Sequence, residues 1–201
     1  MTTYIPQITI PHQVFSNAAA SVLLPIALGT GVGFSTRLLF PNRIPVTASK
    51  TQDTYRLMKQ PPLRPPPQVF GPAWTTLYGL MGYAAHRAIT AGLNPLTSSV
   101  EGVRDAKHAA TLYTIQLGLN LAWMPLFFGM RKPVAALVDI VALLGLNSYL
   151  TYQFFQMDTV AGWCFVPYVA WLSFATYLNT GVGYMNNWKI TDEDLLKKRN
   201  E

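Results

Sequence analysis

Apolar residues are concentrated in five long runs of the chain, separated by short polar segments. A helix needs about 20 apolar residues to cross the roughly 30 Å hydrocarbon core of a bilayer. The runs therefore predict five membrane-spanning helices, over approximately residues 16–40, 72–91, 107–129, 133–156 and 159–185. We predict an all-α integral membrane protein, with residues 1–201 forming one five-helix membrane domain that has a short N-terminal segment and a charged C-terminal tail.

The composition supports a membrane protein and excludes several other classes. Half of the residues are apolar and only 12% are charged, whereas soluble domains have about 25% charged residues. The single cysteine, Cys164, excludes an internal disulfide and a cysteine cluster. Histidines spaced for haem or metal ligation are also missing. We therefore expect no metal site, no required cofactor and no nucleic-acid partner.

Basic residues are distributed unequally between the two sides of the predicted bundle. The side with Arg37, the loop 41–71, Arg131, Lys132 and the C-terminal tail receives twelve of the 15 Lys and Arg residues. Cytoplasmic loops hold this excess, so we expect the loop and the C-terminus to be cytosolic. The first 15 residues lack Lys and Arg, unlike a signal peptide or a mitochondrial presequence. An outer organelle membrane or the endoplasmic reticulum fits best.

The loop before the second predicted helix is rich in proline. Residues 61–67 hold five prolines, and Pro72 follows at the start of the helix. Proline fixes φ and removes the backbone donor, which predicts a stiff extended segment without hydrogen-bonded structure and places Pro72 in the first helical turn. A stiff loop at the mouth of a helix bundle suggests a lid.

Aromatic and amide side chains recur at helical spacing in three of the predicted spans, so each set shares one helix face. The sets are Trp74, Tyr78 and Met81; Tyr113, Gln116, Asn120, Trp123 and Phe127; and Trp171, Ala175, Leu178 and Asn179. Such faces could enclose a flat apolar ligand that Gln116, Asn120 and Asn179 orient. Periodicity alone favours the alternative, that they serve helix packing and interface anchoring.

Three further features leave alternatives open. Asp139 in the fourth span is either a functional carboxyl group, or a group that hydrogen-bonds across a helix interface or is solvated near the cytosolic end. Gly29 and Gly33 form a GxxxG spacing, which suits a homodimer contact or packing within the chain. Cys164 is expected to be a small buried apolar residue.

Three blocks of sequence resemble the signature regions of the translocator protein family, also called tryptophan-rich sensory proteins or peripheral-type benzodiazepine receptors. They are KQPPLRPPPQVFGPAWTTLYGLMGY at 59–83, LYTIQLGLNLAWMPLFFG at 112–129 and PYVAWLSFATYLN at 167–179. The blocks occur in the family's order and fit inside the predicted spans. The resemblance extends over residues from about 15 to 188.

The resemblance implies a five-helix bundle, often dimeric, with a cytosol-facing pocket that binds porphyrins, sterols and isoquinoline or benzodiazepine drugs. Eukaryotic members are typically found in the mitochondrial outer membrane with a cytosolic C-terminus. The positions that match the family's pocket are Phe70, Trp74, Tyr78, Asn120, Trp123, Phe127, Trp171, Ala175 and Leu178. Asp139 matches an acidic position of the family's fourth helix.

The chain departs from the family pattern in the lid and at the end of the fifth helix. Gln68 and Leu63 stand where the family usually has aromatic residues, and Gly183 and Tyr184 replace a Trp-Arg pair. A sterol-recognition pattern can be drawn from Leu178 through Tyr184 to Lys189, although such patterns are weak.

Three functions follow as hypotheses. The first is a membrane receptor for porphyrin-type tetrapyrroles and related planar ligands, acting in their transport or sensing. The second is an enzyme that breaks down bound porphyrin in light, with Trp74 and Trp171 as electron donors. The third is a sterol or lipid transporter.

Overall fold

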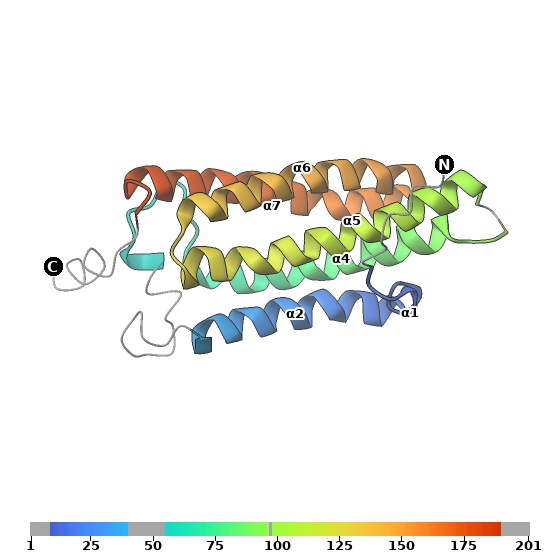
Figure 1. Cartoon of the computed structure of the whole chain (residues 1–201), viewed down its shortest axis with the longest axis horizontal. Helices are drawn as coiled ribbons and strands as arrows, with labels where there is room; N and C mark the ends of the chain where they lie inside the picture. Colours follow the sequence, from blue (N-terminus) through green and yellow to red (C-terminus); the bar gives the residue numbers. More distant parts are fainter. Residues whose placement is uncertain (1–8, 40–54, 97, 190–201) are drawn as a thin grey trace.

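The computed structural model describes residues 9–39, 55–96 and 98–189, and its regular structure over those residues is entirely helical (Figure 1). The elements are α1 (His12–Ser16), α2 (Ala18–Leu39), the 3₁₀ turn η2 (Pro67–Val69), α4 (Phe70–Gly92), α5 (Val100–Met124), the π-helical turn η3 (Pro125–Gly129), α6 (Pro133–Met157) and α7 (Thr159–Met185). Each of the five long helices overlaps one of the five predicted runs.

Local capping explains where the observed helices differ from the predicted limits. The first run is divided at Asn17, whose side chain accepts a hydrogen bond from the Ala20 amide at 3.1 Å and so begins α2. Helix α5 begins seven residues before the predicted 107 because Ser99 accepts a hydrogen bond from the Gly102 amide. The charged residues in the first turns of α5 are compatible with a helix, but they would be costly in the hydrocarbon core of a bilayer. Phe40, the predicted end of the first span, lies outside the described residues.

Three of the described helices are long and apolar enough to cross a membrane, judged by length and composition. They are α2 over Ala18–Thr36, α6 and α7. Helices α4 and α5 have the length but carry more polar residues, including Arg87 in α4 and Glu101, Arg104, Asp105 and Lys107 in α5. Crossing by all five helices therefore stays a prediction.

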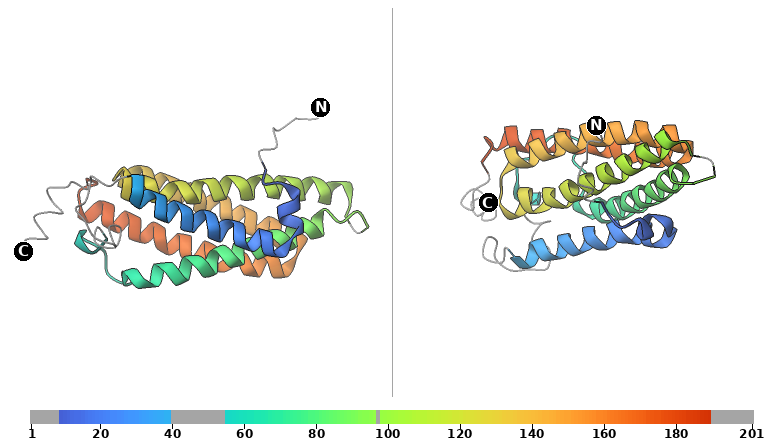
Figure 2. Two further views of the ribbon diagram at one scale, coloured as in Figure 1. Left: turned by 90° about the horizontal axis from the view of Figure 1, so that it is seen from below. Right: turned by 45° about the vertical axis from the view of Figure 1, so that its right-hand side comes forward.

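The long helices lie side by side along the long axis of the molecule (Figures 1 and 2). Helix α2 packs against α4, α4 against α7, α7 against α6, and α6 against α5, while α5 also contacts α4 and α2. Glycines allow the closest approach. A Cβ added to Gly82 would lie 2.7 Å from the Val22 Cα, and the Ser21 hydroxyl donates to the Gly82 carbonyl at 2.8 Å. This close contact fixes α2 against α4.

Exposed aromatic side chains gather at the two ends of the bundle. Tyr152 and Trp163 are 61% and 64% exposed beside the turn that joins α6 to α7. Tyr184, at 77%, and Trp188 are exposed at the opposite end, just before and after the end of α7. Aromatic residues at two levels are typical of a protein that contacts both headgroup regions of a bilayer.

The proline-rich loop is fastened to the last turns of α7. The Tyr177 hydroxyl donates to the Pro62 carbonyl at 2.9 Å, and the Asn186 amide donates to the Lys59 carbonyl at 2.8 Å. As predicted, Pro72 lies in the first turn of α4. The prediction of no hydrogen-bonded structure was wrong at one place, because the Val69 amide donates to the Pro66 carbonyl. Proline lacks a donor, but its carbonyl still accepts.

Candidate ligand-binding site

Aromatic rings from α4 and α7 meet near the lid end of the bundle. The Trp74 ring lies 6.3 Å from the rings of both Trp171 and Tyr168, and 5.3 Å from that of Tyr78, measured between centroids. The Phe70 ring lies 6.0 Å from that of Trp171. Most of these pairs meet edge to face, which suits their quadrupoles. We call these five residues the aromatic cluster.

A chain of hydrogen bonds joins the aromatic cluster to α5. The Tyr78 hydroxyl donates to Asn120 Oδ1 at 2.7 Å, and Asn120 Nδ2 donates to the Tyr168 hydroxyl at 2.8 Å. That hydroxyl donates in turn to Gln116 Oε1 at 3.3 Å. Gln116 and Asn120 were predicted to orient a ligand, but in this structure their bonded atoms connect three helices.

The remaining predicted aromatic residues form a second group beside the first. The rings of Trp123 and Phe127 are stacked at 5.0 Å with an interplanar angle of 14°. The Trp123 indole donates to Asn179 Oδ1 at 3.2 Å, and Asn179 Nδ2 donates to the Pro133 carbonyl at 3.0 Å. The π-helical turn that follows α5 positions Phe127, and such turns are frequent at functional sites. Asn179 therefore joins α5 and α6 to α7.

The other two predicted pocket residues lie on α7 between these groups. Ala175 is partly buried against the main core, and Leu178 is 9% exposed. The structure thus divides the predicted lining into two aromatic groups, the first bonded to Asn120 of α5 and the second to Asn179 of α7.

The lid reaches the aromatic cluster through Tyr55. Its ring lies 5.2 Å from that of Phe70, and its hydroxyl donates to the Pro65 carbonyl at 3.0 Å. Partial burial raises the pKa of the Tyr55 hydroxyl, and the nearby Arg64 opposes that effect. The phenol is therefore neutral and able to donate at physiological pH. Tyr55 was not predicted, because nothing in its local sequence pattern relates it to α4.

Asp139 does not occupy the solvated position that was one interpretation of its place in the sequence. It is 8% exposed, so it is not a solvated group, and its Oδ2 has no hydrogen-bond partner among the described residues. It lies near enough to Tyr168 for the two groups to interact electrostatically. Its position therefore adds an unpaired acceptor to the interior beside the aromatic cluster.

The sterol pattern does not form one surface. Leu178 is buried, Tyr184 is largely exposed, and Lys189 lies beyond the end of α7. Gly183, where the family has Trp, holds the folded-back ring of Trp188, since a Cβ there would lie within 2.9 Å of the indole. Trp188 thus covers part of the space that a longer side chain at Gly183 would take.

The GxxxG glycines face other helices of the same chain. A Cβ on Gly29 would lie 2.6 Å from Tyr78 Cζ, and one on Gly33 would lie 3.8 Å from Met124 Sδ. Both glycines therefore serve packing within the chain, and a homodimer contact through them stays a prediction.

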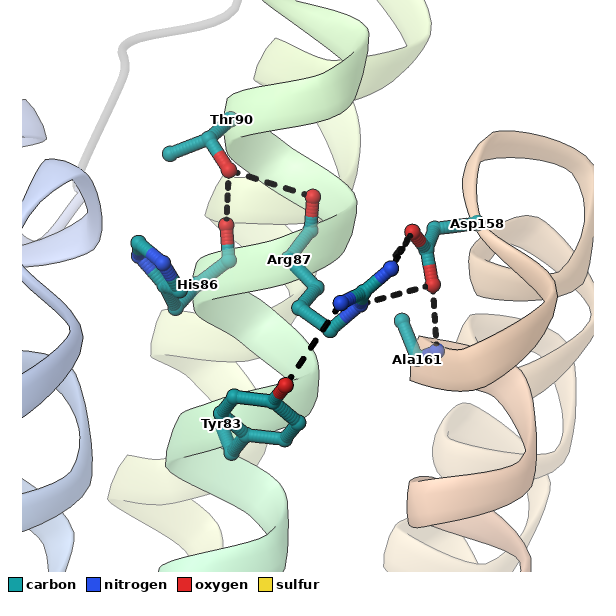
Figure 3. Close-up of polar contacts among 6 residues, drawn as sticks. All are labelled: Tyr83, His86, Arg87, Thr90, Asp158 and Ala161. Carbon is teal, nitrogen blue, oxygen red and sulfur yellow. Dashed lines mark hydrogen bonds and ion pairs between the residues drawn. The ribbon is translucent and has the colours of Figure 1, made fainter.

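An ion pair closes the bundle at the end opposite the lid (Figure 3). Arg87 Nη2 of α4 lies 2.7 Å from Asp158 Oδ2, and Arg87 Nε donates to both carboxylate oxygens. Asp158 also accepts the Ala161 amide and so caps α7. The hydrogen bond from Arg87, followed by the helix amides, lowers the pKa of Asp158. The sequence did not predict this pair, whose members are 71 residues apart.

Tyr168 is the central residue that sequence reasoning missed. It is fully buried and bonds to Asn120 and Gln116. A signal was present, because Tyr168 lies three residues before Trp171 and therefore extends the predicted face of the fifth span by one turn.

Residues 21–185 match the sequence model of the TspO/MBR family. The translocator protein homolog of Schizosaccharomyces pombe is 36% identical over 179 residues, which cover 87% of this chain and 98% of the relative. The tryptophan-rich protein TspO of Archaeoglobus fulgidus is 35% identical over 167 residues, covering 83% and 95%. The human translocator protein is 38% identical over 125 residues, covering 62% and 70%.

Proposed function

The chain belongs to the TspO/MBR family of membrane proteins, and on that basis we propose that it is a receptor for porphyrins and related planar apolar ligands. These ligands include sterols and isoquinoline or benzodiazepine-type drugs, and the receptor acts in their transport or sensing. It requires no cofactor of its own, since the tetrapyrrole is its ligand.

The aromatic cluster carries this proposal. Trp74 and Trp171 lie on different helices with their rings nearly perpendicular, at 82°. A flat ligand that enters between α4 and α7 could stack on one ring and meet the edge of the other, which are the two favoured aromatic geometries. The neighbouring amides supply the few polar groups that such sites use for orientation.

Entry requires the lid to move. Phe70 lies between Tyr55 of the lid and Trp171 of the cluster, with ring contacts on both sides. The hydrogen bonds from Tyr177 and Asn186 hold the same loop against α7. Each is a bond of about 1 kcal/mol net, so the loop can release without unfolding the bundle.

The proposal also covers the membrane topology, the location and the oligomeric state of the receptor. All five long helices cross the membrane, with the lid and the C-terminus in the cytosol, where the basic residues are concentrated. The mitochondrial outer membrane is the proposed location, with the endoplasmic reticulum as the alternative. A homodimer is part of the proposal.

The deciding experiment is a titration with protoporphyrin IX of the protein in lipid nanodiscs, kept dark and followed by tryptophan fluorescence. Trp74→Ala and Trp171→Ala should each weaken binding by roughly 1–3 kcal/mol, because each removes a stacking surface. Trp163→Ala is the matched control, since Trp163 is 64% exposed at the other end of α7. Unchanged affinity in both cluster variants would refute the assignment of the site.

Two further outcomes separate the alternative functions. Loss of the porphyrin absorption bands in light, and only while Trp74 and Trp171 are present, would identify light-dependent breakdown. Absence of saturable quenching would instead favour sterol or lipid handling.

A further inference from the structure

Two buried hydrogen-bond donors on α5 have no partner among the described residues. They are Gln116 Nε2 and the Tyr113 hydroxyl, on side chains that are 0% and 1% exposed. Leaving a buried polar group unpaired costs about 1–3 kcal/mol, and nearly all such groups in proteins are paired. Two unpaired donors at adjacent turns of one helix therefore indicate that a partner from beyond the described residues belongs there.

The two donors lie beside the aromatic cluster. They are three residues apart and so neighbours on one face of α5. Gln116 bonds to Tyr168 through Oε1, which leaves Nε2 as the end of the chain that begins at Tyr78. Tyr113 interacts electrostatically with both Tyr78 and Tyr168. The donors therefore adjoin Tyr78 and Tyr168, the two tyrosines whose rings contact Trp74.

We propose that Tyr113 and Gln116 form a recognition site for a neutral carbonyl oxygen at the buried end of a planar ligand. The inference rests on the proposed function, because it specifies one chemical group of the ligand that the aromatic cluster binds. Both unpaired atoms donate, so the matching group is an acceptor. One carbonyl oxygen has two lone pairs and can accept from both.

The surroundings select a neutral oxygen over a carboxylate. The buried carboxyl group of Asp139 is an electrostatic neighbour of Tyr168, and its Oδ2 is unpaired. A second carboxylate placed here would be desolvated beside it, and burying an unpaired charge is far more costly than burying a carbonyl. Acidic groups of a ligand should therefore stay at the lid end, near basic residues such as Lys59 and Arg64.

A matched pair of probes tests the proposal. Fluorenone and fluorene are both planar and neutral, and they differ by one carbonyl in place of a methylene. Their affinities are measured by displacement of protoporphyrin IX in nanodiscs, with each free concentration corrected for partition into lipid. We expect fluorenone to bind roughly five- to tenfold more tightly than fluorene, as two hydrogen bonds to one buried carbonyl oxygen allow.

The variants address the two donors directly. Tyr113→Phe and Gln116→Leu each remove one of the two donors, so each should reduce the preference for fluorenone, the ratio of the two affinities, to about two- to threefold. Gln116→Leu also removes the acceptor of the Tyr168 hydroxyl and should lower the affinity for both probes, whereas Tyr113→Phe should leave fluorene affinity unchanged. Tyr184→Phe is the control, because that hydroxyl belongs to a side chain that is 77% exposed. If a variant folds poorly, ¹³C-labelled fluorenone bound to the unaltered protein gives a second readout. Its carbonyl stretch should lie below the frequency measured in an apolar solvent.

Each contrary result has a distinct meaning. Protoporphyrin binding without a fluorenone preference, or with a carbonyl stretch as in hydrocarbon, overturns the carbonyl site and leaves the proposed function intact. Failure of protoporphyrin itself to bind refutes the proposed function. In ligand-free protein, Tyr113→Phe should not lower the unfolding temperature. A fall of several degrees would mean that the hydroxyl already binds a buried water, which overturns the assignment to the ligand.

Discussion

Replacing Gly29 with alanine should disturb the aromatic cluster from the far side of α4. The added Cβ would lie 2.6 Å from Tyr78 Cζ and 2.8 Å from the Tyr78 hydroxyl oxygen. The ring must retreat by about 1 Å to restore ordinary van der Waals distance. That movement breaks or lengthens the 2.7 Å hydrogen bond to Asn120, which is itself buried.

The magnitude follows from three terms. Overpacking in a close-packed interior costs about 1–3 kcal/mol, and loss of the hydrogen bond to a buried amide costs about 1–3 kcal/mol more. The gain in helix propensity from glycine to alanine is about 1 kcal/mol. We therefore expect Gly29→Ala to lower the free energy of unfolding by about 1–5 kcal/mol in net terms. Porphyrin affinity should also fall, because Tyr78 is in contact with Trp74.

The assay is denaturant-induced unfolding in detergent micelles, followed by tryptophan fluorescence, together with the porphyrin titration. Gly31→Ala is the control on the same helix, since nothing lies within 4 Å of a Cβ at that position. The stability of the Gly31→Ala variant should be unchanged or slightly raised. Adding Tyr78→Leu to Gly29→Ala should recover part of the lost stability by relieving the overlap. Equal stability of Gly29→Ala and Gly31→Ala would show that Tyr78 does not pack on α2.

Three further predictions concern other contacts. Gly82→Ala should destabilise the protein by about 1–3 kcal/mol, because its Cβ would meet the backbone of α2; Gly79→Ala, with open space around it, should not, and equal unfolding midpoints would contradict this packing. The lowered pKa of Asp158 means that its contact with Arg87 stabilises the protein at pH values above the ordinary pKa of a carboxyl group. This stabilisation is lost as the pH falls below about 4. Asp158→Asn keeps the helix cap but should flatten the dependence of the unfolding temperature on pH in that range, and an unaltered pH profile would exclude the ion pair as its cause. Asn179→Leu should cost about 1–3 kcal/mol by leaving a partly buried indole donor and a buried carbonyl without their hydrogen bonds to this side chain; an unfolding temperature equal to that of the parent protein would refute the bridging role.

The sequence predicted the helices well because helix formation in this chain depends on local properties. Each signal acts on residues close to it in the sequence. The signals are the runs of apolar residues, the proline at the start of α4, and the hydroxyl or amide caps. The limits of α6 and α7 agree with the prediction to within one residue. The family assignment was also confirmed, since the signature blocks are continuous stretches of sequence.

The sequence predicted which residues of the candidate site share a helix face, but not which contacts they make with other helices. Spacing alone placed Trp74 with Tyr78, and Trp171 with Ala175, because residues three or four apart share a helix face. It could not show that Gln116 and Asn120 would bond to Tyr168, or that Tyr55 would close over Phe70. Those contacts depend on how far each helix is rotated and shifted against its neighbours.

The sequence by itself therefore determined a helical membrane protein of a known family, with three aromatic helix faces and a stiff proline-rich loop. The tertiary structure alone decided which polar groups are satisfied and which are not. It paired Arg87 with Asp158, buried Asp139, and left Tyr113 and Gln116 each with a donor that has no partner in the described part of the chain. The physical reason is that hydrogen bonding between helices needs atoms within about 3 Å of each other, and only the packing of whole helices sets distances that short.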